Sequence, residues 1–242
     1  MGTGFVYHVS AASDNKMPCP CDECKGEIKI HWKIYVRTAR HVVFNSEEAE
    51  KTKIDFFYDD TDSLIHGMVK SVWGIKLEVE EPDPKFDESV ILCITHDENL
   101  VRRIKSDKSH WKPFINYSPI FYPNNRGLID SLPTAEACRK YAHAVIFSHP
   151  HYMPKMVSVG KWNTSQNHSI DISNNGIKFQ YQTPTCSGCS GAPVILIHPY
   201  QDLFNPNFFP WSGPVHSGTK TLKKVKYQDN YSKSLEHTYP VL

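Results

Sequence analysis

The chain lacks the features that would direct it to a membrane or to nucleic acid. Its 242 residues contain no apolar run of about eighteen residues, so the sequence predicts no transmembrane helix. The start has no basic segment followed by an apolar one, which argues against a secretory signal peptide. Neither sign of charge dominates, because the formal net charge is only +1. We therefore expect a cytoplasmic protein that contacts neither nucleic acid nor membrane.

Seven cysteines are present, an odd number, and in the absence of a leader we expect reduced thiols. Three of them lie in Cys19-Pro20-Cys21-Asp22-Glu23-Cys24. With one more thiol or imidazole they could bind zinc tetrahedrally. The Cys21–Cys24 pair has no matching second pair at zinc-finger spacing, however, and we expect the flanking histidines, His8 and His31, to be strand residues. The sequence therefore favours a hairpin loop with free thiols, and it predicts no metal and no cofactor.

Helical periodicity is weak, and short segments rich in Val, Ile, Tyr and Phe dominate between Pro, Gly, Asn and Asp turns. This pattern predicts an all-β fold of barrels or sandwiches, and not alternating strands and helices. The expected strands are Gly4–Val9, Ile28–Val36, Ile54–Tyr58, Met68–Trp73, Ile75–Val79, Val90–Thr95, Ala144–Ser148, Met156–Val159, Ile177–Tyr181 and Val194–His198.

Composition divides the chain into four segments. Residues 1–106 and 133–218 are rich in strand signals, and the proline-containing stretch 107–132 between them is expected to be a linker. A short helix is expected at 135–141. Residues 219–242 are basic and polar, without an apolar face, and are interpreted as a loosely ordered tail.

The run from Thr185 to Val194 contains a serine between glycines, in the order Gly188-Cys189-Ser190-Gly191, just before an apolar segment. A tight turn of this kind exposes the serine hydroxyl and directs backbone N–H groups beside it. Those are the two parts that acyl transfer requires, a nucleophile and donors for the oxyanion. A structural turn before a buried strand is the alternative reading.

A serine needs a base and a carboxylate that orients the base. His41 is the candidate base, because it follows the expected strand ending at Val36 on a turn of small residues. Asp87 is the candidate carboxylate, because it opens an apolar strand where backbone donors can hold it. Asp83 and Asp97 are alternative carboxylates, but neither lies at the entrance of that strand as Asp87 does.

Four motifs together resemble the trypsin-like (chymotrypsin-fold) serine peptidases. They are Gly2-Thr3-Gly4-Phe5-Val6, Thr38-Ala39-Arg40-His41-Val42-Val43, Asp87 before a strand, and Gly188-Cys189-Ser190-Gly191-Ala192-Pro193. The order His, Asp, Ser matches that family. The likeness spans roughly residues 2 to 218 and is strongest to leaderless invertebrate domains and to bacterial and viral members.

The resemblance implies two six-stranded-type antiparallel β-barrels with the active site in the cleft between them. Ser190 would attack the carbonyl of a polypeptide substrate, His41 would take its proton, and Asp87 would fix the imidazole tautomer. The amides of Gly188 and Ser190 would form the oxyanion hole. The expected function is thus a serine endopeptidase.

Two positions, Cys189 and Arg40, depart from the family, and two more, Thr185 and His216, suggest specificity. Cys189 replaces the aspartate that pairs with a new N-terminus in mammalian digestive members, so the enzyme would be active without zymogen cleavage. Arg40 places a cation beside the base and would lower the imidazole pKa. Thr185 and His216 resemble the specificity residues of glutamyl endopeptidases, which indicates a preference for Glu or Gln.

Alternative readings remain at this stage. Cys189 is a rival nucleophile, although the Ser-Gly-x-Pro pattern follows Ser190. A pseudo-protease that keeps the fold as a binding or scaffold domain is the main functional alternative. An α/β-hydrolase esterase is disfavoured, because the Gly-x-Ser-x-Gly elbow lacks its last glycine.

Overall fold

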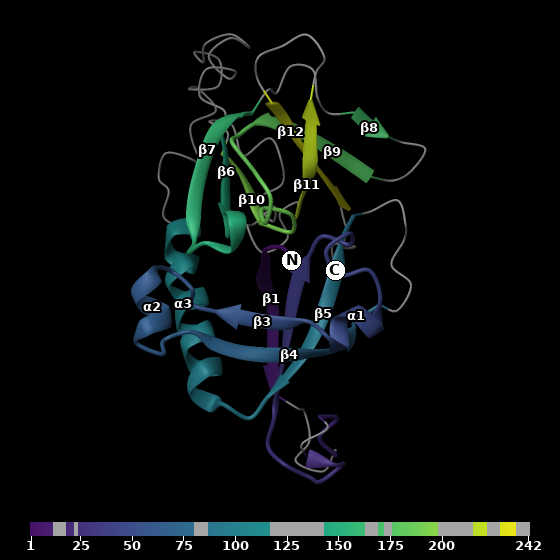
Figure 1. Ribbon diagram of the computed structural model, residues 1–242, viewed down its shortest axis with the longest axis vertical. Coiled ribbons are helices and arrows are strands. Elements are labelled where there is room, and N and C mark those ends of the chain that lie inside the picture. Colours follow the sequence, from purple (N-terminus) through teal and green to yellow (C-terminus); the bar gives the residue numbers. More distant parts are fainter. Residues whose placement is uncertain are drawn as a thin grey trace.

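Two curled antiparallel β-sheets, one in each half of the chain, form most of the computed structural model (Figure 1). The structure describes residues 1–11, 18–21, 24–79, 87–116, 143–162, 169–171, 176–197, 215–221 and 228–235. The all-β, two-sheet architecture expected from the sequence is confirmed, with five strands in the first sheet and seven in the second among the described residues.

The first sheet has the order β1-β2-β5-β4-β3. Its strands are β1 (Gly4–Ala11), β2 (Trp32–Thr38), β3 (Lys53–Phe56), β4 (Lys70–Leu77) and β5 (Ser89–Thr95). The central strand β5 is buried on both faces, as its apolar run Val-Ile-Leu-Cys-Ile requires. Ile91 and Cys93 enter the main core with Ile34 and Val36 of β2, whereas Leu92 and Ile94 pack on a smaller cluster.

The second sheet has the order β10-β6-β7-β9-β12-β11, and β8 pairs with β9 at its side. Its strands are β6 (His143–Ser148), β7 (Met156–Trp162), β8 (Ser169–Asp171), β9 (Gly176–Gln182), β10 (Val194–Ile197), β11 (Val215–Thr221) and β12 (Gln228–Leu235). A bridge between Pro193 and Val215 connects the two ends of this order, so the sheet curls back on itself.

Strand β12 corrects the expectation of a loosely ordered tail at 219–242. Residues Gln228–Leu235 pair with β9 on one side and with β11 on the other, so they lie inside the sheet. The segment has little apolar character, and its strand state comes from backbone pairing with both neighbours, which sequence periodicity does not report.

Three helices accompany the first sheet: α1 (Ser46–Glu50), α2 (Thr61–Ile65) and α3 (Glu98–Asn116). Helix α3 was not expected from the sequence, and it includes the first ten residues of the predicted linker 107–132. It buries Leu100 and Ile104 against the main core. The Asp97 carboxylate accepts a hydrogen bond from the Leu100 amide at 3.0 Å, so this rival to Asp87 caps the helix instead. The rest of the predicted linker, the predicted helix at 135–141 and Asp83 lie outside the described residues.

Outside the candidate site, loops of the two halves of the chain also contact each other. Lys155, just before β7, forms an ion pair with Asp59, and its amide donates to the Tyr58 carbonyl at 3.0 Å. The Tyr58 ring stacks on His149, with centroids 5.8 Å apart. Within the described residues, none of the helices combines the length and apolar character needed to cross a membrane.

The main core predicts that replacing two isoleucines will change the free energy of unfolding by very different amounts. Ile34 is 0% exposed, whereas Ile65 at the end of α2 is 75% exposed. Ile34→Ala should lower the free energy of unfolding by about 2–5 kcal/mol because it leaves a cavity. Ile65→Ala should change it by less than about 0.5 kcal/mol. Urea denaturation measures both, and equal losses in the two variants would contradict the described core.

Candidate functional site

His41 and Asp87 lie at the same end of the first sheet, where it faces the second sheet. His41 sits on the turn after β2, in which the amides of Val42 and Val43 both donate to the Ala39 carbonyl. Asp87 precedes β5 by two residues. Because Thr38 is the register partner of Ser89, the antiparallel pairing of β2 and β5 brings the two segments together.

The Asp87 carboxylate holds His41 through two hydrogen bonds. His41 Nδ1 lies 2.7 Å from Asp87 Oδ2, and the His41 backbone amide donates to Oδ1 at 3.0 Å. An ionised carboxylate only accepts, so Nδ1 carries the proton and Nε2 is left with its lone pair. This is the tautomer required of a general base that accepts a proton on Nε2.

Ser217 is a member of this network that the sequence analysis missed. Its hydroxyl donates to Asp87 Oδ2 at 2.5 Å, although it lies on β11 of the second sheet. In the sequence, Ser217 was identifiable only as the neighbour of His216, a residue that was assigned to specificity alone. Asp87 therefore receives donors from both sheets.

The two pKa values move apart in the directions expected of a base and its orienting carboxylate. The hydrogen bond and charge of Asp87 raise the pKa of His41 above 6.5, against the opposing effect of burial. Burial of Asp87 would raise its pKa, but hydrogen bonds from the His41 ring, Ser217 and the His41 amide outweigh it, so the pKa falls below 3.8.

The pair therefore stabilises the fold in a defined pH window. The stability that His41 contributes to the fold is fully present below the pKa of the unfolded histidine. It is lost as the pH rises through the raised pKa of the folded state. The contribution of Asp87 is complete above its unfolded pKa and is lost as the pH falls through its lowered one. Both are present between about pH 4 and 6.5.

Arg40 does not act as the sequence analysis expected. The pKa of His41 is raised and not lowered, and Asp87 is the dominant influence on it. The Arg40 guanidinium lies over the Phe44 ring, 4.5 Å from its centroid. Its planar cation is thus engaged by an aromatic face.

The serine turn is built on two glycines with left-handed backbone. Gly188 has φ +94° and Gly191 has φ +88°, a region that glycine adopts without strain. A Cβ on Gly191 would lie 2.0 Å from the Thr3 carbonyl oxygen and 2.9 Å from the Ala39 nitrogen. The turn therefore packs directly against the segment that leads to His41, and Ser190 lies half-buried at this junction.

Backbone hydrogen bonds divide the amides of this turn into two groups. Those of Cys189, Gly191 and Ala192 donate to carbonyls of Cys186, His216 and Cys189. In the described part of the chain, those of Gly188 and Ser190 have no such acceptor. The two amides assigned to an oxyanion hole are thus among those that donate to no backbone carbonyl in the described residues.

The Cys189 side chain is buried beside the last residue of β6. It is 2% exposed, and its sulfur lies 3.3 Å from Ser148 Oγ and accepts from the Cys186 amide at 3.4 Å. A substrate carbonyl cannot reach a thiol in this position without rearrangement of the turn. Of the two nucleophiles that the sequence offers, the buried Cys189 is therefore the less accessible.

The predicted specificity residues occupy different environments. His216 on β11 is 2% exposed, and its Nδ1 lies 2.6 Å from the Tyr181 hydroxyl. Burial, with a smaller effect from the charge of His41, lowers the pKa of His216 to about 4. Thr185 is half-buried just before the serine turn. His216 is therefore neutral at pH 7.

A second group of polar side chains lies at the opposite end of the first sheet. Cys19, Cys21, Cys24 and His96 place their ligand atoms within 4.8 Å of one another. His96, on the connection from β5 to α3, supplies the fourth side chain that the sequence analysis could not find. Neither His8, beside Tyr35, nor His31, beside His96, belongs to this group.

In comparisons with known proteins, no family model matches the chain, and no curated protein is similar to it in sequence.

The His41–Asp87 contact predicts a pKa change that requires no catalytic assay. Asp87→Asn removes the negative charge and should lower the pKa of His41 toward or below 6.5. NMR titration of the imidazole protons measures it, with His41→Gln to assign the signal. Asp97→Asn removes a carboxylate that caps α3 and should leave the pKa of His41 unchanged. An unaltered titration in Asp87→Asn would contradict the described pairing.

Proposed function

We propose that the protein is a serine endopeptidase of the trypsin-like type. The observation that carries the proposal is the chain of contacts from Ser217 to Asp87 to His41, next to a serine turn whose Gly191 packs against the segment before His41. Orienting carboxylate, base of the correct tautomer and serine occupy adjacent segments. This combination supports acyl transfer more than it supports a purely structural turn.

In the proposed reaction, Ser190 Oγ attacks the carbonyl carbon of a peptide bond while His41 Nε2 takes its proton. His41 then gives that proton to the departing amine, and an acyl-enzyme on Ser190 remains. Water, deprotonated by the same imidazole, hydrolyses the ester. Asp87 stays ionised throughout and stabilises the imidazolium, in line with its lowered pKa.

The available amides of Gly188 and Ser190 support an oxyanion hole. Two fixed N–H groups aimed at a developing negative charge lower the barrier without reorganisation. The Gly188 carbonyl accepts from the Thr3 hydroxyl at 2.7 Å, and the Ser190 carbonyl accepts from the Thr3 amide at 2.8 Å. These bonds orient the peptide planes of the turn.

The surroundings of Cys189 support activity without zymogen cleavage. Its thiol is held by Ser148 and by the Cys186 amide, so the turn needs no charged partner at this position. The Thr3 contacts further fix the turn from the side of the first sheet. A preformed turn is what a constitutively active peptidase requires.

The proposal predicts covalent labelling of Ser190 by a fluorophosphonate probe. Ser190→Ala should abolish labelling, and His41→Ala should slow it by about three orders of magnitude because the base is lost. Cys189→Ala should retain labelling, because the thiol is buried away from the turn surface. Mass spectrometry of the labelled peptide locates the adduct. Folded protein that stays unlabelled beside a reactive control peptidase would instead support the scaffold alternative.

We further propose a preference for glutamine over glutamate at the residue before the cleaved bond. A neutral His216 has no charge to offer a carboxylate. With Nδ1 engaged by Tyr181, the ring presents Nε2 alone, as donor or acceptor. An amide can satisfy either role, whereas an ionised carboxylate only accepts. The preference for Glu or Gln inferred from Thr185 and His216 thus narrows to Gln.

This preference is measurable with paired peptides. The ratio of kcat/KM for Gln over Glu substrates should be about tenfold or more, which corresponds to about 1.4 kcal/mol. It should stay level from about pH 7 to 9, because the pKa of His216, about 4, lies well below that range. Tyr181→Phe should reduce the ratio, and Tyr35→Phe in the first sheet should not. A ratio that favours Glu would contradict the proposal.

A further inference from the structure

Three sulfur atoms and one imidazole nitrogen converge at the end of the first sheet remote from the second sheet. Cys19 and Cys24 are buried, Cys21 is half-buried and His96 is exposed. Three of the ligands come from the connection between β1 and β2, and the fourth follows β5. Figure 1 shows the described residues of this connection beyond the strands of the first sheet, on the side away from β6 to β12.

The distances fit the edges of a small tetrahedron. His96 Nε2 lies 3.5, 3.6 and 3.2 Å from the sulfurs of Cys19, Cys21 and Cys24, and the Cys19 and Cys21 sulfurs are 3.3 Å apart. Tetrahedral Zn²⁺ with ordinary Zn–S and Zn–N bonds gives ligand-to-ligand edges of about 3.5–3.8 Å. Small adjustments of side chains would therefore seat the ion.

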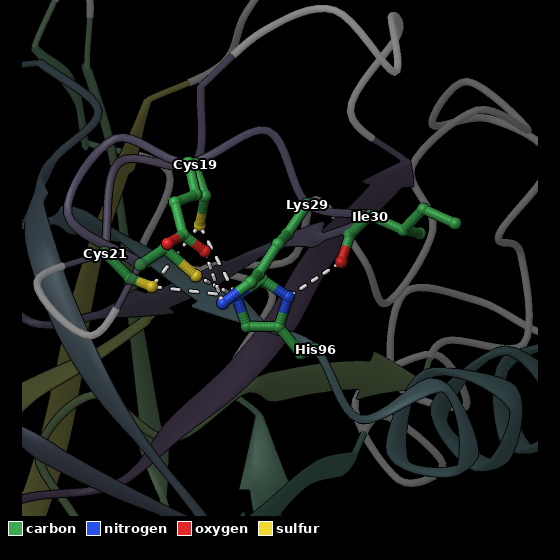
Figure 2. A network of polar contacts seen from close by, with 7 residues as sticks. Cys19, Cys21, Lys29, Ile30 and His96 are labelled. Atoms are coloured by element: carbon green, nitrogen blue, oxygen red, sulfur yellow. Dashed lines mark hydrogen bonds and ion pairs between the residues drawn. The ribbon is translucent and has the colours of Figure 1, made fainter.

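The orientation of His96 is that of a metal ligand. Its Nδ1 lies 2.7 Å from the Ile30 carbonyl oxygen, so Nδ1 carries the proton and donates. Nε2 then has a lone pair, and Figure 2 shows it facing the sulfur atoms while Nδ1 faces Ile30. A backbone carbonyl that fixes the tautomer of a ligating histidine is a recurrent outer contact of zinc sites.

The cysteine loop has a backbone that holds its three thiols on one side. The Cys19 amide donates to the Glu27 carbonyl at 2.9 Å, and the Glu27 amide donates to the Cys24 carbonyl at 2.8 Å. The Cys24 amide donates to the Cys21 carbonyl at 3.2 Å, closing the Cys-x-x-Cys turn. Cys19 and Cys24 rest on Leu92 and Ile94 of β5, the strand that leads to His96.

We propose that Cys19, Cys21, Cys24 and His96 bind one Zn²⁺ ion as a structural site. Four protein ligands complete the tetrahedron and leave no position for water or substrate, which distinguishes it from a catalytic site. The ion would tie the β1–β2 connection to the start of α3. The seven-residue strands β2 and β5 separate it from His41 and Asp87 by about 20 Å, so the site is independent of the proposed peptidase chemistry.

A disulfide explains the cluster less well. Joining two of the three thiols would leave the third sulfur and the oriented Nε2 without a role. The Cys19 and Cys21 sulfurs, 3.3 Å apart, are also well beyond the S–S bond length of about 2.05 Å. Zinc uses all four groups at once. Iron also binds thiolates, and metal analysis separates the two.

Elemental analysis of the full-length chain, purified without chelator, tests the site. We expect about one equivalent of zinc per chain, less than about 0.2 in His96→Ala, and about one in Cys186→Ser, which removes an exposed thiol elsewhere. Removal of zinc by a chelator should lower the apparent Tm by about 5 °C or more, and added zinc should restore it. Iron in place of zinc, or metal-free protein with a Cys19–Cys21 or Cys21–Cys24 disulfide, would overturn the proposal.

A variant that keeps four ligands guards against loss of folding in His96→Ala. His96→Cys should retain about one equivalent of zinc. After exchange for Co²⁺, it should show stronger thiolate-to-metal charge-transfer absorption than the wild type, together with tetrahedral d–d bands. Its fluorophosphonate labelling should match the wild type, so the outcome is separate from that of the peptidase proposal. Zinc retained equally by His96→Ala and His96→Cys would exclude His96 as a ligand.

Discussion

The hydrogen bonds of Thr3 join the two sheets at the candidate site. Its amide and hydroxyl donate to the Ser190 and Gly188 carbonyls, its carbonyl accepts from the Thr38 hydroxyl, and its hydroxyl accepts from the His149 amide. Thr3 is 4% exposed, so breaking any one of these bonds would leave a buried polar group unsatisfied. Thr3 therefore connects three segments through hydrogen bonds: the serine turn, the segment before His41 and the loop after β6.

The charged group of the site, the Asp87 carboxylate, also has hydrogen-bond donors from both sheets. Its acceptors are used by His41 from the first sheet and by Ser217 from the second. Burial alone would raise the pKa of this acid, but the hydrogen bonds from His41 and Ser217 outweigh burial and lower it. The tautomer of His41 is set by Asp87 within the first sheet, and the Ser217 hydroxyl from the second sheet further lowers the pKa of that carboxylate.

Local signals in the sequence predicted the all-β architecture and most strands, because alternation and turn residues are encoded within a few positions. Motif order also indicated that His41 and Asp87 would meet, and the register of β2 with β5 explains why they do. Helix α3 was missed because Pro113 and the charged residues around it obscured the apolar spacing of Leu100 and Ile104. Strand β12 was missed because backbone pairing with β9 and β11, and not an apolar face, defines it.

The site residues that escaped prediction share a physical cause, since each is brought into place by pairing between distant strands. Ser217 reaches Asp87 because β11 begins next to the first sheet, and no local pattern identifies its partner. His96 meets the cysteine loop because Trp32 pairs with Thr95, so the start of β2 and the end of β5 coincide. The same pairing carries Thr38 and Ser89 to the other end. One antiparallel register therefore builds the thiol cluster and the His–Asp pair at opposite ends of two strands, and a slip of this register would displace both.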